Sequence, residues 1–417
     1  MSQHRPAAVL KTLWANLEAG EARGEAAAAH IRAHLRIVVA GGDGTITWVL
    51  GSIMELGLTP APPVAALPLG TGNDLSLNFG WGTQFSWAWV RHEALYASLK
   101  RYKDAEVRSL DCWRVEMAAP AAGLFQETPH SMRVAPGDPR AASALFWNYF
   151  SIGLDAAAAY GFHALREAHP RLAAGRLANQ AWYSWFSCAS GWFCGAPPLA
   201  ATVRLRVRDA PDAAWRDLAL PRSVRAVVLL NLQSYGGGRD VWGLANTGSM
   251  PRKGFSPPIY DDGRIEVVGL RSGWHTAVVM GQLTPRIHAK RLAQCCEVEL
   301  ELASAGGGGP VRGEGATTHM QLDGEPWPQP IPAAGGGGAP LRLRVSRAGQ
   351  SRVLLNAADA QGPAKAQQLT QRGAGISRGV SEESGSAAAA AASAAAVDGS
   401  ARSGSEAEVL RGGSVDD

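Results

Sequence analysis

The chain has 417 residues, which leaves room for two domains and a tail at about 150 residues per domain. Apolar residues make up 46% of it, ample for a sizeable core, and the net charge is +4 with a pI near 8.9. This mildly basic balance is compatible with anionic ligands or a membrane surface. A net charge of +4 is far below the strong positive excess that is typical of nucleic-acid-binding proteins.

The cysteines and the N-terminus indicate the compartment. The five cysteines show no Cys-x-x-Cys pair and no zinc-finger spacing with histidine, so we expect free, buried thiols of an intracellular protein: Cys112, Cys188, Cys194, Cys295 and Cys296. No apolar run follows the first residues, which indicates no secretory signal. The longest uncharged span, residues 177–203, is too polar and too interrupted for a transmembrane helix. We therefore expect a cytoplasmic protein that meets a membrane only at its surface.

Two strand–glycine turn–helix units follow residues 1–35, whose Ala, Leu and Glu content and apolar spacing predict a helix. In the first unit, a strand over residues 35–40 leads into Gly41-Gly-Asp-Gly-Thr45 and an apolar helix. In the second unit, the strand 64–69 leads into Gly70-Thr-Gly-Asn-Asp74. Successive units of this kind predict a Rossmann-like parallel α/β sheet. Both turns would lie at the carboxyl ends of its strands, where ligands gather.

Both turns lack large side chains. Glycine lets the backbone approach a ligand closely, and a helix start favours negative charge. A phosphate is the ligand that fits, and a tight connection without a ligand is the alternative. Neither turn matches GxGxxG or the Walker A sequence, so a phosphate site here is of another type.

After an expected helix over residues 87–102, short strand-like runs replace the helical spacing. The expected strands are 107–115, 144–152, 201–207, 226–232, 264–270, 296–302, 319–322 and 341–345. Helices over 155–167 and 285–294 interrupt them, and the Gly-, Pro- and Ala-rich segments 118–143, 303–317 and 333–339 predict loops. This pattern predicts a β-rich, sandwich-like domain.

We therefore expect three segments: an α/β domain over residues 1–110, a β-rich domain over 111–355 and a tail over 356–417. The tail has almost no large apolar residues and contains the low-complexity run 384–396. Such a composition cannot build a core, so we expect the tail to be disordered.

Motifs in both domains occur in the order found in one enzyme family. Gly41-Gly-Asp-Gly-Thr45, Leu67-Pro-Leu-Gly-Thr-Gly-Asn-Asp74 and Phe79-Gly-Trp-Gly82 resemble the catalytic domain of eukaryotic diacylglycerol kinases. The blocks that resemble its accessory domain are 148–156, 231–238 with Trp242-Gly243, 261–270 and Leu322-Asp-Gly-Glu-Pro-Trp327. The chain is most similar to the short plant-type kinases, and it contains no cysteine-rich C1 module.

The resemblance implies an ATP- and Mg²⁺-dependent lipid kinase. It would phosphorylate 1,2-diacylglycerol to phosphatidate at a membrane surface, without a nucleic-acid partner or an obligate protein partner. A ceramide or sphingoid-base kinase shares the GGDGT architecture and is the alternative enzyme. Members of the family usually begin with a strand and an Asn-Pro-x-Ser-Gly-Gly-type phosphate loop. This chain starts after that point, so we expect both to be missing, and a catalytically inactive membrane-associated module is the second alternative.

The resemblance also implies site residues by position. The ATP phosphates would be held by Gly41, Gly42, Asp43, Gly44 and Thr45, and the nucleotide would be contacted by Gly70, Thr71, Gly72, Asn73 and Asp74. Asp74 would help to hold Mg²⁺–ATP, and Asp262 resembles a structural Mg²⁺ site of bacterial members. Glu325 resembles the proton acceptor of bacterial lipid kinases. Asp43 occupies the position of the base in some relatives, so both are candidates for the catalytic carboxylate.

The chemistry of phosphoryl transfer accounts for these residue types. The reaction needs N–H donors and a metal ion around the phosphates, and it needs a carboxylate near the attacking hydroxyl. Each carboxylate also has a simpler interpretation. Asp74 can cap a helix that begins at Leu75, Glu325 can be an exposed loop carboxylate, and Asp262 can be an ordinary turn residue.

Two further features bear on the lipid. An aromatic stripe at helical spacing is typical of a core or, alternatively, of a membrane interface; it consists of Trp182, Trp185, Phe186, Trp192 and Phe193. Arg286, Lys290 and Arg291 would put cations on one side of the expected helix 285–294. Such a side is either solvated or able to attract anionic headgroups.

Overall fold

The computed structural model describes residues 5–70, 72–91, 93–125, 127–169, 182, 185–186, 196–243, 250–271, 274–281, 287–303, 316–332 and 339–357. They belong to one compact unit, Met1–Lys365. Several expectations fall on residues outside the described ones: Thr71, most of the loops 303–317 and 333–339, the tail beyond residue 357, Cys188, Cys194, Trp192, Phe193 and Arg286.

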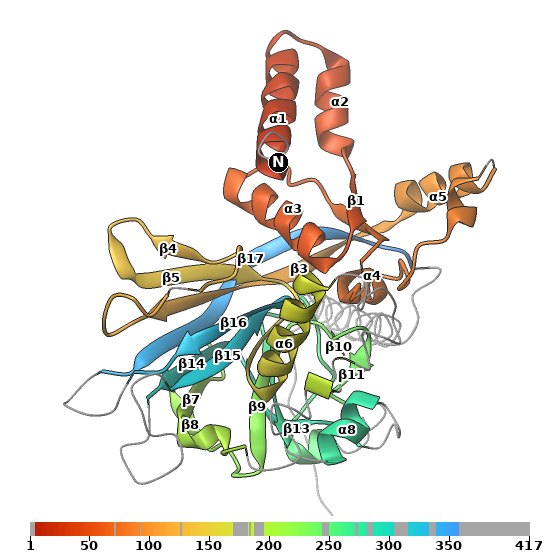
Figure 1. The fold of residues 1–417 in the computed structure, drawn as a ribbon. Helices are drawn as coiled ribbons and strands as arrows, with labels where there is room; N and C mark the ends of the chain where they lie inside the picture. Colours follow the sequence, from red (N-terminus) through yellow and green to blue (C-terminus); the bar gives the residue numbers. More distant parts are fainter. Residues whose placement is uncertain are drawn as a thin grey trace, which may run out of the picture. The chain divides into compact units, whose positions relative to one another are not determined.

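The N-terminal part is an α/β arrangement around two parallel strands (Figure 1). Its elements are α1 (Pro6–Ala22), α2 (Ala26–His34), β1 (Ile37–Gly41), α3 (Asp43–Leu56), β2 (Val64–Pro68), α4 (Asp74–Asn78), the 3-10 helix η1 (Trp87–Val90) and α5 (Glu93–Asp104). Gly41 lies opposite Pro68 in the parallel β1–β2 pair, so both glycine turns leave the same edge of the sheet, as predicted. The single helix expected over residues 1–35 is a hairpin of two helices, and the one over 87–102 is divided into η1 and α5.

Helix α3 begins where the first glycine turn ends. Gly42 is its N-cap in an extended conformation, and Asp43 is its first residue, where a negative charge complements the helix dipole. The buried side chains recur at helical spacing, as Ile46, Leu50 and Ile53 show. Gly57 ends the helix at φ 60°, a left-handed conformation that glycine adopts without strain.

The β-rich part consists of two large sheets and a small hairpin. Its elements are β3 (Glu106–Ala118), β4 (Arg133–Ala135), β5 (Asp138–Phe146), β6 (Tyr149–Gly153), α6 (Leu154–Ala168), η3 (Leu199–Ala201), β7 (Val203–Arg208), β8 (Arg216–Leu218), β9 (Val224–Leu230), β10 (Ser234–Tyr235), β11 (Arg239–Asp240), η5 (Pro251–Lys253), β12 (Ile265–Arg271), α8 (Trp274–Gly281), β13 (Lys290–Cys295), β14 (Glu297–Leu302), β15 (Thr317–Leu322), β16 (Glu325–Pro330) and β17 (Leu341–Leu355). One sheet has the order β4-β5-β3-β17-β14-β7-β8 and the other β13-β12-β9-β6-β15-β16, while β10 and β11 pair separately.

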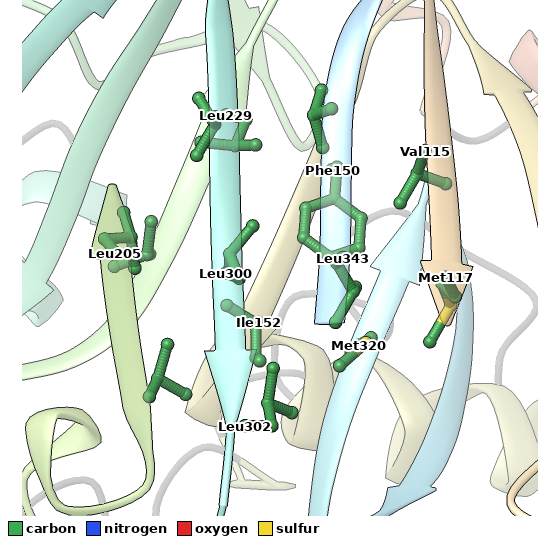
Figure 2. Packing of buried hydrophobic residues seen from close by; sticks show 14 of the residues in the cluster. Val115, Met117, Phe150, Ile152, Leu205, Leu229, Leu300, Leu302, Met320 and Leu343 are labelled. Carbon is green, nitrogen blue, oxygen red and sulfur yellow. The ribbon is translucent and has the colours of Figure 1, made fainter. Parts of the chain in front are cut away.

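One hydrophobic core receives side chains from both large sheets (Figure 2). Alternate residues of each strand point into it, which is the packing of a β-sandwich. The first sheet contributes Val115, Met117, Leu205, Leu300, Leu302 and Leu343, and the second contributes Phe150, Ile152, Leu229 and Met320. The fold is therefore an α/β part followed by a β-rich sandwich, as the sequence predicted.

Strand β17 joins the two parts. Along its length it pairs with β3, its first half also pairs with β14, and near its end Val353 pairs in parallel with Val64 of β2. The sheet that contains β3 and β17 therefore continues into β2 and β1. A second core lies at this junction and combines residues of α3, such as Leu50, with Leu110 of β3 and Leu354 of β17.

Three expectations about the second part are wrong. The single strand expected over residues 144–152 is divided between β6 and the end of β5. Residues 290–295 form strand β13, not the end of a helix, because pairing with β12 overrides the helix-forming character of Lys, Arg, Ala and Gln. The expected cationic helix face is absent from these described residues, since Arg291 is buried and its guanidinium donates to the carbonyls of Trp242 and Gly243. The expected loop 118–143 contains β4 and the beginning of β5.

Within the described residues, no helix combines the length and the apolar character that a membrane crossing requires. Cys112 and Cys295 are free and buried, and Cys296 is free and half-buried. In the expected aromatic stripe, the rings of Trp182 and Phe186 lie 6.4 Å apart, whereas Trp185 is 63% exposed.

Candidate active site

The two glycine turns contact each other through their backbones. A Cβ on Gly70 would lie only 2.4 Å from the Cα of Gly42. The N–H of Leu69 donates to the carbonyl of Gly41 at 3.1 Å, which extends the pairing of β1 and β2 into the turns. Glycine is required here because any side chain would overlap the backbone of the other turn.

Asp43 links the first turn to the helix after the second. Its Oδ2 accepts the N–H of Asp74 at 2.7 Å, and its Oδ1 accepts the N–H of Leu75 at 3.1 Å. These two N–H groups belong to the first turn of α4 and have no acceptor within that helix. The half-buried Asp43 carboxylate thus caps α4 from a neighbouring helix. Gly44 and Thr45, which follow Asp43 in α3, are exposed.

Asp74 reaches in the opposite direction, towards the β-rich part. Only 2% of its surface is exposed, and its carboxylate accepts the N–H groups of Gly237 and Gly238 at 2.7–3.1 Å. These glycines lie between β10 and β11, where Gly236 to Gly238 have φ of 56°, 94° and 95°. Successive left-handed residues of this kind form an anion-binding concavity. Asp74 therefore ties α4 to the β10–β11 hairpin and does not cap its own helix.

Asn73 fixes the shape of the second turn. It is left-handed with φ 46°, its Oδ1 accepts the N–H of Gly70, and its Nδ2 donates to the carbonyls of Gly70 and Thr83. The side-chain amide is thus committed to the protein's own backbone. Gly72, by contrast, is exposed, and a Cβ on it would lie 3.5 Å from Oδ2 of Asp43.

The β-rich part contributes the hairpin between β15 and β16. Asp323 and Gly324 form its two-residue turn with φ of 46° and 88°, and the Asp323 carboxylate accepts the N–H groups of Trp147, Asn148 and Tyr149 at 2.8–3.0 Å. Glu325 begins β16 and is half-buried. Its Oε2 accepts hydrogen bonds from the hydroxyl and the N–H of Ser131 at 2.9 and 3.3 Å.

The carboxylates influence one another electrostatically. Burial, and then the charge of Asp74, raises the pKa of Asp43 to about 8, and Asp323 adds to this shift. Burial raises the pKa of Asp323 to about 7, with a further contribution from Glu325, although three backbone N–H groups oppose it. Burial also raises the pKa of Asp74, against the N–H groups of Gly237 and Gly238. The charges of Asp74 and Asp323 thus act on Asp43, and the charge of Glu325 acts on Asp323. Carboxyl groups whose pKa values are shifted by burial and by one another are typical of functional sites.

Asp262 belongs to a different place in the fold. It is exposed in the turn before β12, and its Oδ1 accepts the N–H of Arg264 at 2.9 Å. The neighbouring Gly263 donates its N–H to the buried carboxylate of Asp111. These bonds are those of a turn residue. Across the described residues, no cluster of three or more His, Cys, Asp or Glu side chains is arranged to hold a metal ion.

Sequence reasoning did not assign a role to three features of the site. The first is Asp323, although Asp-Gly is a strong signal for a two-residue hairpin. The second is the pair Gly237 and Gly238, which the run of three glycines could have indicated. The third is Asn148, which is 1% exposed and whose side-chain amide has no hydrogen-bond partner among the described residues. A buried polar group of this kind suits a ligand, and sequence alone gives no signal for it.

Comparison with known proteins places these features in a family. The diacylglycerol kinase catalytic domain matches residues 3–101, and the diacylglycerol kinase accessory domain matches residues 145–326. Diacylglycerol kinase 1 of Oryza sativa is 36% identical over 350 residues, which cover 78% of this chain and 68% of that protein. The chain belongs to the diacylglycerol kinase family.

Other members of the family are similar over comparable lengths. Diacylglycerol kinase 4 of Arabidopsis thaliana is 40% identical over 336 residues, covering 75% of this chain and 66% of that protein, so the chain spans just under two thirds of this relative. Rat diacylglycerol kinase zeta is 33% identical over 70% of this chain and 28% of its own length. Among solved structures, a diacylglycerol kinase from Bacillus anthracis aligns at 15% identity and a TM-score of 0.39, covering 77% of this chain and 78% of that one.

The two diacylglycerol kinase domains divide the site between them. The catalytic-domain match contains both glycine turns with Asp43 and Asp74, and the accessory-domain match contains the glycines of the β10–β11 hairpin together with Asp323 and Glu325. The hydrogen bonds from Gly237 and Gly238 to Asp74 therefore join the two family domains directly at the candidate active site.

Proposed function

We propose that this member of the family is an ATP-dependent diacylglycerol kinase, which converts ATP and 1,2-diacylglycerol into ADP and phosphatidate. The observation that carries the proposal is the convergence of two backbone-lined glycine turns and a glycine hairpin on Asp43 and Asp74. Each glycine turn presents backbone to a ligand, and the start of α3 favours negative charge, so phosphates fit this edge of the sheet. The names of the similar plant and animal proteins support diacylglycerol as the acceptor.

In the proposed reaction, the free hydroxyl oxygen of diacylglycerol attacks the γ-phosphorus of ATP. The bond between the γ-phosphorus and the β–γ bridging oxygen breaks, and ADP leaves with that oxygen. The proton of the hydroxyl passes to a carboxylate. We assign this role to Glu325, which stands half-buried at the start of β16, and retain Asp43 as the second candidate. The two hydrogen bonds of Asp43 to α4 support a positioning role for it beside any role with the proton.

Mg²⁺ fits the chemistry of this site. Asp43, Asp74 and Asp323 bring negative charge together under burial, which a divalent cation would offset. Mg²⁺ is commonly bound by one or two carboxylates together with substrate phosphates, so a closed set of protein ligands is not required. When bound, it would neutralise charge on the phosphates. Asp43, which is half-buried, would hold it, whereas Asp74 is only 2% exposed and both of its oxygens accept N–H groups of the glycine hairpin, which supports an anchoring role for Asp74.

We further propose that residues 1–110 form the nucleotide-binding domain and 111–355 the accessory domain, with a separate tail over 356–417. The predicted nucleotide contacts from Gly41 to Thr45 and from Gly70 to Asp74 belong to the first of these. Asp262 is retained only as a predicted structural Mg²⁺ ligand, because its contacts are those of a turn. We place the protein in the cytoplasm, at the surface of the membrane that contains its lipid substrate.

An assay with ATP radiolabelled at the γ-phosphate tests the proposal. The chain is incubated with Mg²⁺ and mixed micelles that contain diacylglycerol, ceramide or a sphingoid base, and the lipids are separated by chromatography. We expect label in phosphatidate only, and no label after chelation of the metal. Label on ceramide or the sphingoid base would assign the chain to the alternative kinase class, and the absence of any labelled lipid would mark it as an inactive module.

A further inference from the structure

The segment 85–104 exposes an unusual number of large apolar side chains. We call this segment, which contains η1 and α5, the outer lobe. Trp87 is 73% exposed, Tyr96 75%, Leu99 57% and Leu95 43%, and no residue of α5 is buried. In Figure 1, α5 extends away from both large sheets. A cluster of this kind is typical of a surface that binds a partner.

One side of the outer lobe is firmly attached to the protein. The ring of Tyr102 stacks on Trp81 with centroids 4.3 Å apart, and its hydroxyl donates to the carbonyl of Ala66 at 3.3 Å. The guanidinium of Arg36 donates to the carbonyls of Tyr102 and Ala105 at 3.0 and 2.8 Å, which satisfies the end of α5. The opposite side of α5 is therefore presented outward by a helix that is held in place.

The outward side of α5 combines apolar and cationic side chains. At 100° per residue, Leu99, Lys103, Tyr96 and Lys100 fall in that order on the side away from the inward Tyr102, and Glu93 and Asp104 follow Lys100. Two lysines thus lie on the same side as two large apolar side chains, with the carboxylates at its margin. Over the whole outer lobe, the cations Arg91, Lys100, Arg101 and Lys103 outnumber the carboxylates Glu93 and Asp104.

The outer lobe is also connected to the second glycine turn. Asn73, which fixes that turn, donates to the carbonyl of Thr83 at 2.8 Å, just before the outer lobe begins. The stacking of Tyr102 on Trp81 closes the other end of the segment. The start of the outer lobe is therefore attached to the turn that forms part of the candidate site for phosphate.

We propose that the outer lobe docks on a lipid surface that contains anionic headgroups, through Trp87, Tyr96 and Leu99 with Lys100 and Lys103. This inference rests on the proposed function, since a diacylglycerol substrate resides in a membrane. Trp and Tyr favour the membrane–water interface, and lysines can reach anionic headgroups from the same side of a helix. Protein–protein interfaces are instead depleted in lysine, which argues against a second copy of the chain as the occupant.

Flotation of the full chain with vesicles tests the inference. Vesicles of phosphatidylcholine alone and of phosphatidylcholine with phosphatidylserine are compared. Tyr96→Ala with Leu99→Ala should weaken partitioning to both vesicle types, about tenfold or more. Lys100→Glu with Lys103→Glu should weaken partitioning roughly tenfold or more only where phosphatidylserine is present, and added salt should reduce this difference.

Matched controls lie on α1, at its N-cap and on α2, where apolar and basic side chains are also exposed. Val9→Ala with Ile31→Ala removes two exposed aliphatic groups, and Arg5→Glu with Lys11→Glu reverses two exposed charges. Partitioning of both controls should match the wild type. Equal partitioning of the lobe variants and the wild type would overturn the inference. So would a loss of self-association in the lobe variants, measured by light scattering, without a loss of vesicle binding.

A soluble short-chain diacylglycerol separates this inference from the proposed function. The lobe variants should phosphorylate it at the wild-type rate while losing activity on vesicles. Absence of turnover in every protein, combined with the predicted vesicle binding, would refute the proposed function and leave the docking surface standing. An equal loss of activity on the soluble and the vesicle substrate would overturn the docking role.

Discussion

The two parts of the candidate active site are constructed differently. In the α/β part, the proposed phosphate site is made of glycine turns, which fit together because Gly42 and Gly70 have no side chains. In the β-rich part, the candidate groups are side chains at the ends of paired strands, such as Asp323 and Glu325. We therefore expect that a methyl group added to a glycine turn destabilises the protein and abolishes turnover. A carboxylate at the end of a strand, by contrast, can be replaced by an amide without displacing the strand.

The largest effect is expected for Gly70→Ala. The new Cβ would lie 2.4 Å from the Cα of Gly42, and because both atoms are attached to backbone the turns must separate. Over-packing of this kind costs about 3 kcal/mol, so we expect a lower melting temperature and no measurable phosphoryl transfer. Gly44→Ala is the matched control for stability, because a Cβ there meets no atom within 4 Å. Equal melting temperatures for the two variants would show that the turns are not in contact as described.

A large effect on turnover with a smaller one on folding is expected for Asp43→Asn. An amide offers one acceptor oxygen in place of two, so either Asp74 or Leu75 loses the acceptor of its N–H, which costs about 1 kcal/mol as for other N-caps. Turnover should fall roughly 100-fold or more, because a carboxylate at the phosphates is lost. Kinetics and urea unfolding measure the two effects. Asp217→Asn, at a highly exposed carboxylate, should change neither. Wild-type turnover in Asp43→Asn would remove Asp43 from the site.

The sequence predicted the α/β part well because its signals are local. An apolar run followed by glycines predicts a strand, a turn and a helix, and β1, β2 and the turns lie where the pattern indicated. The contact between Gly42 and Gly70 is not visible in the sequence, since it depends on the parallel pairing of β1 with β2. The same holds for the bonds between Asp74 and the glycines near residue 237, which are more than 160 positions away.

The β-rich part was harder to predict because pairing partners decide its strands. Glu325–Pro330 contains three prolines, a pattern that argues against a strand, yet β16 forms by pairing with β15 at the edge of its sheet. Residues 290–295 have helix-forming side chains and still form β13, which pairs with β12 at the edge of its sheet. Asp323 was overlooked because its three N–H partners come from residues 147–149, far away in the sequence.

A smaller effect concerns the pH dependence of stability. Because the pKa of Asp323 is raised to about 7 in the folded protein, the folded state binds a proton that the unfolded state releases near pH 4. The free energy of unfolding should therefore fall as the pH rises from 5 to 7, by at most about 1.4 kcal/mol per pH unit for one proton. Asp323→Asn should reduce that slope in urea unfolding at several pH values. An unchanged slope would mean that Asp323 is ionised throughout this range.

The most direct test of the account is the comparison of ATP affinity and turnover in Glu325→Gln. If backbone turns hold the nucleotide and a strand-borne carboxylate accepts the proton, the variant should bind ATP as the wild type does. Its turnover on diacylglycerol should fall roughly 100-fold or more. Glutamine can still accept the hydrogen bonds of Ser131, so the melting temperature should not change. Glu299→Gln, at a surface ion pair with Arg206, is the matched control. Wild-type turnover in Glu325→Gln, or loss of ATP binding, would contradict this division of roles.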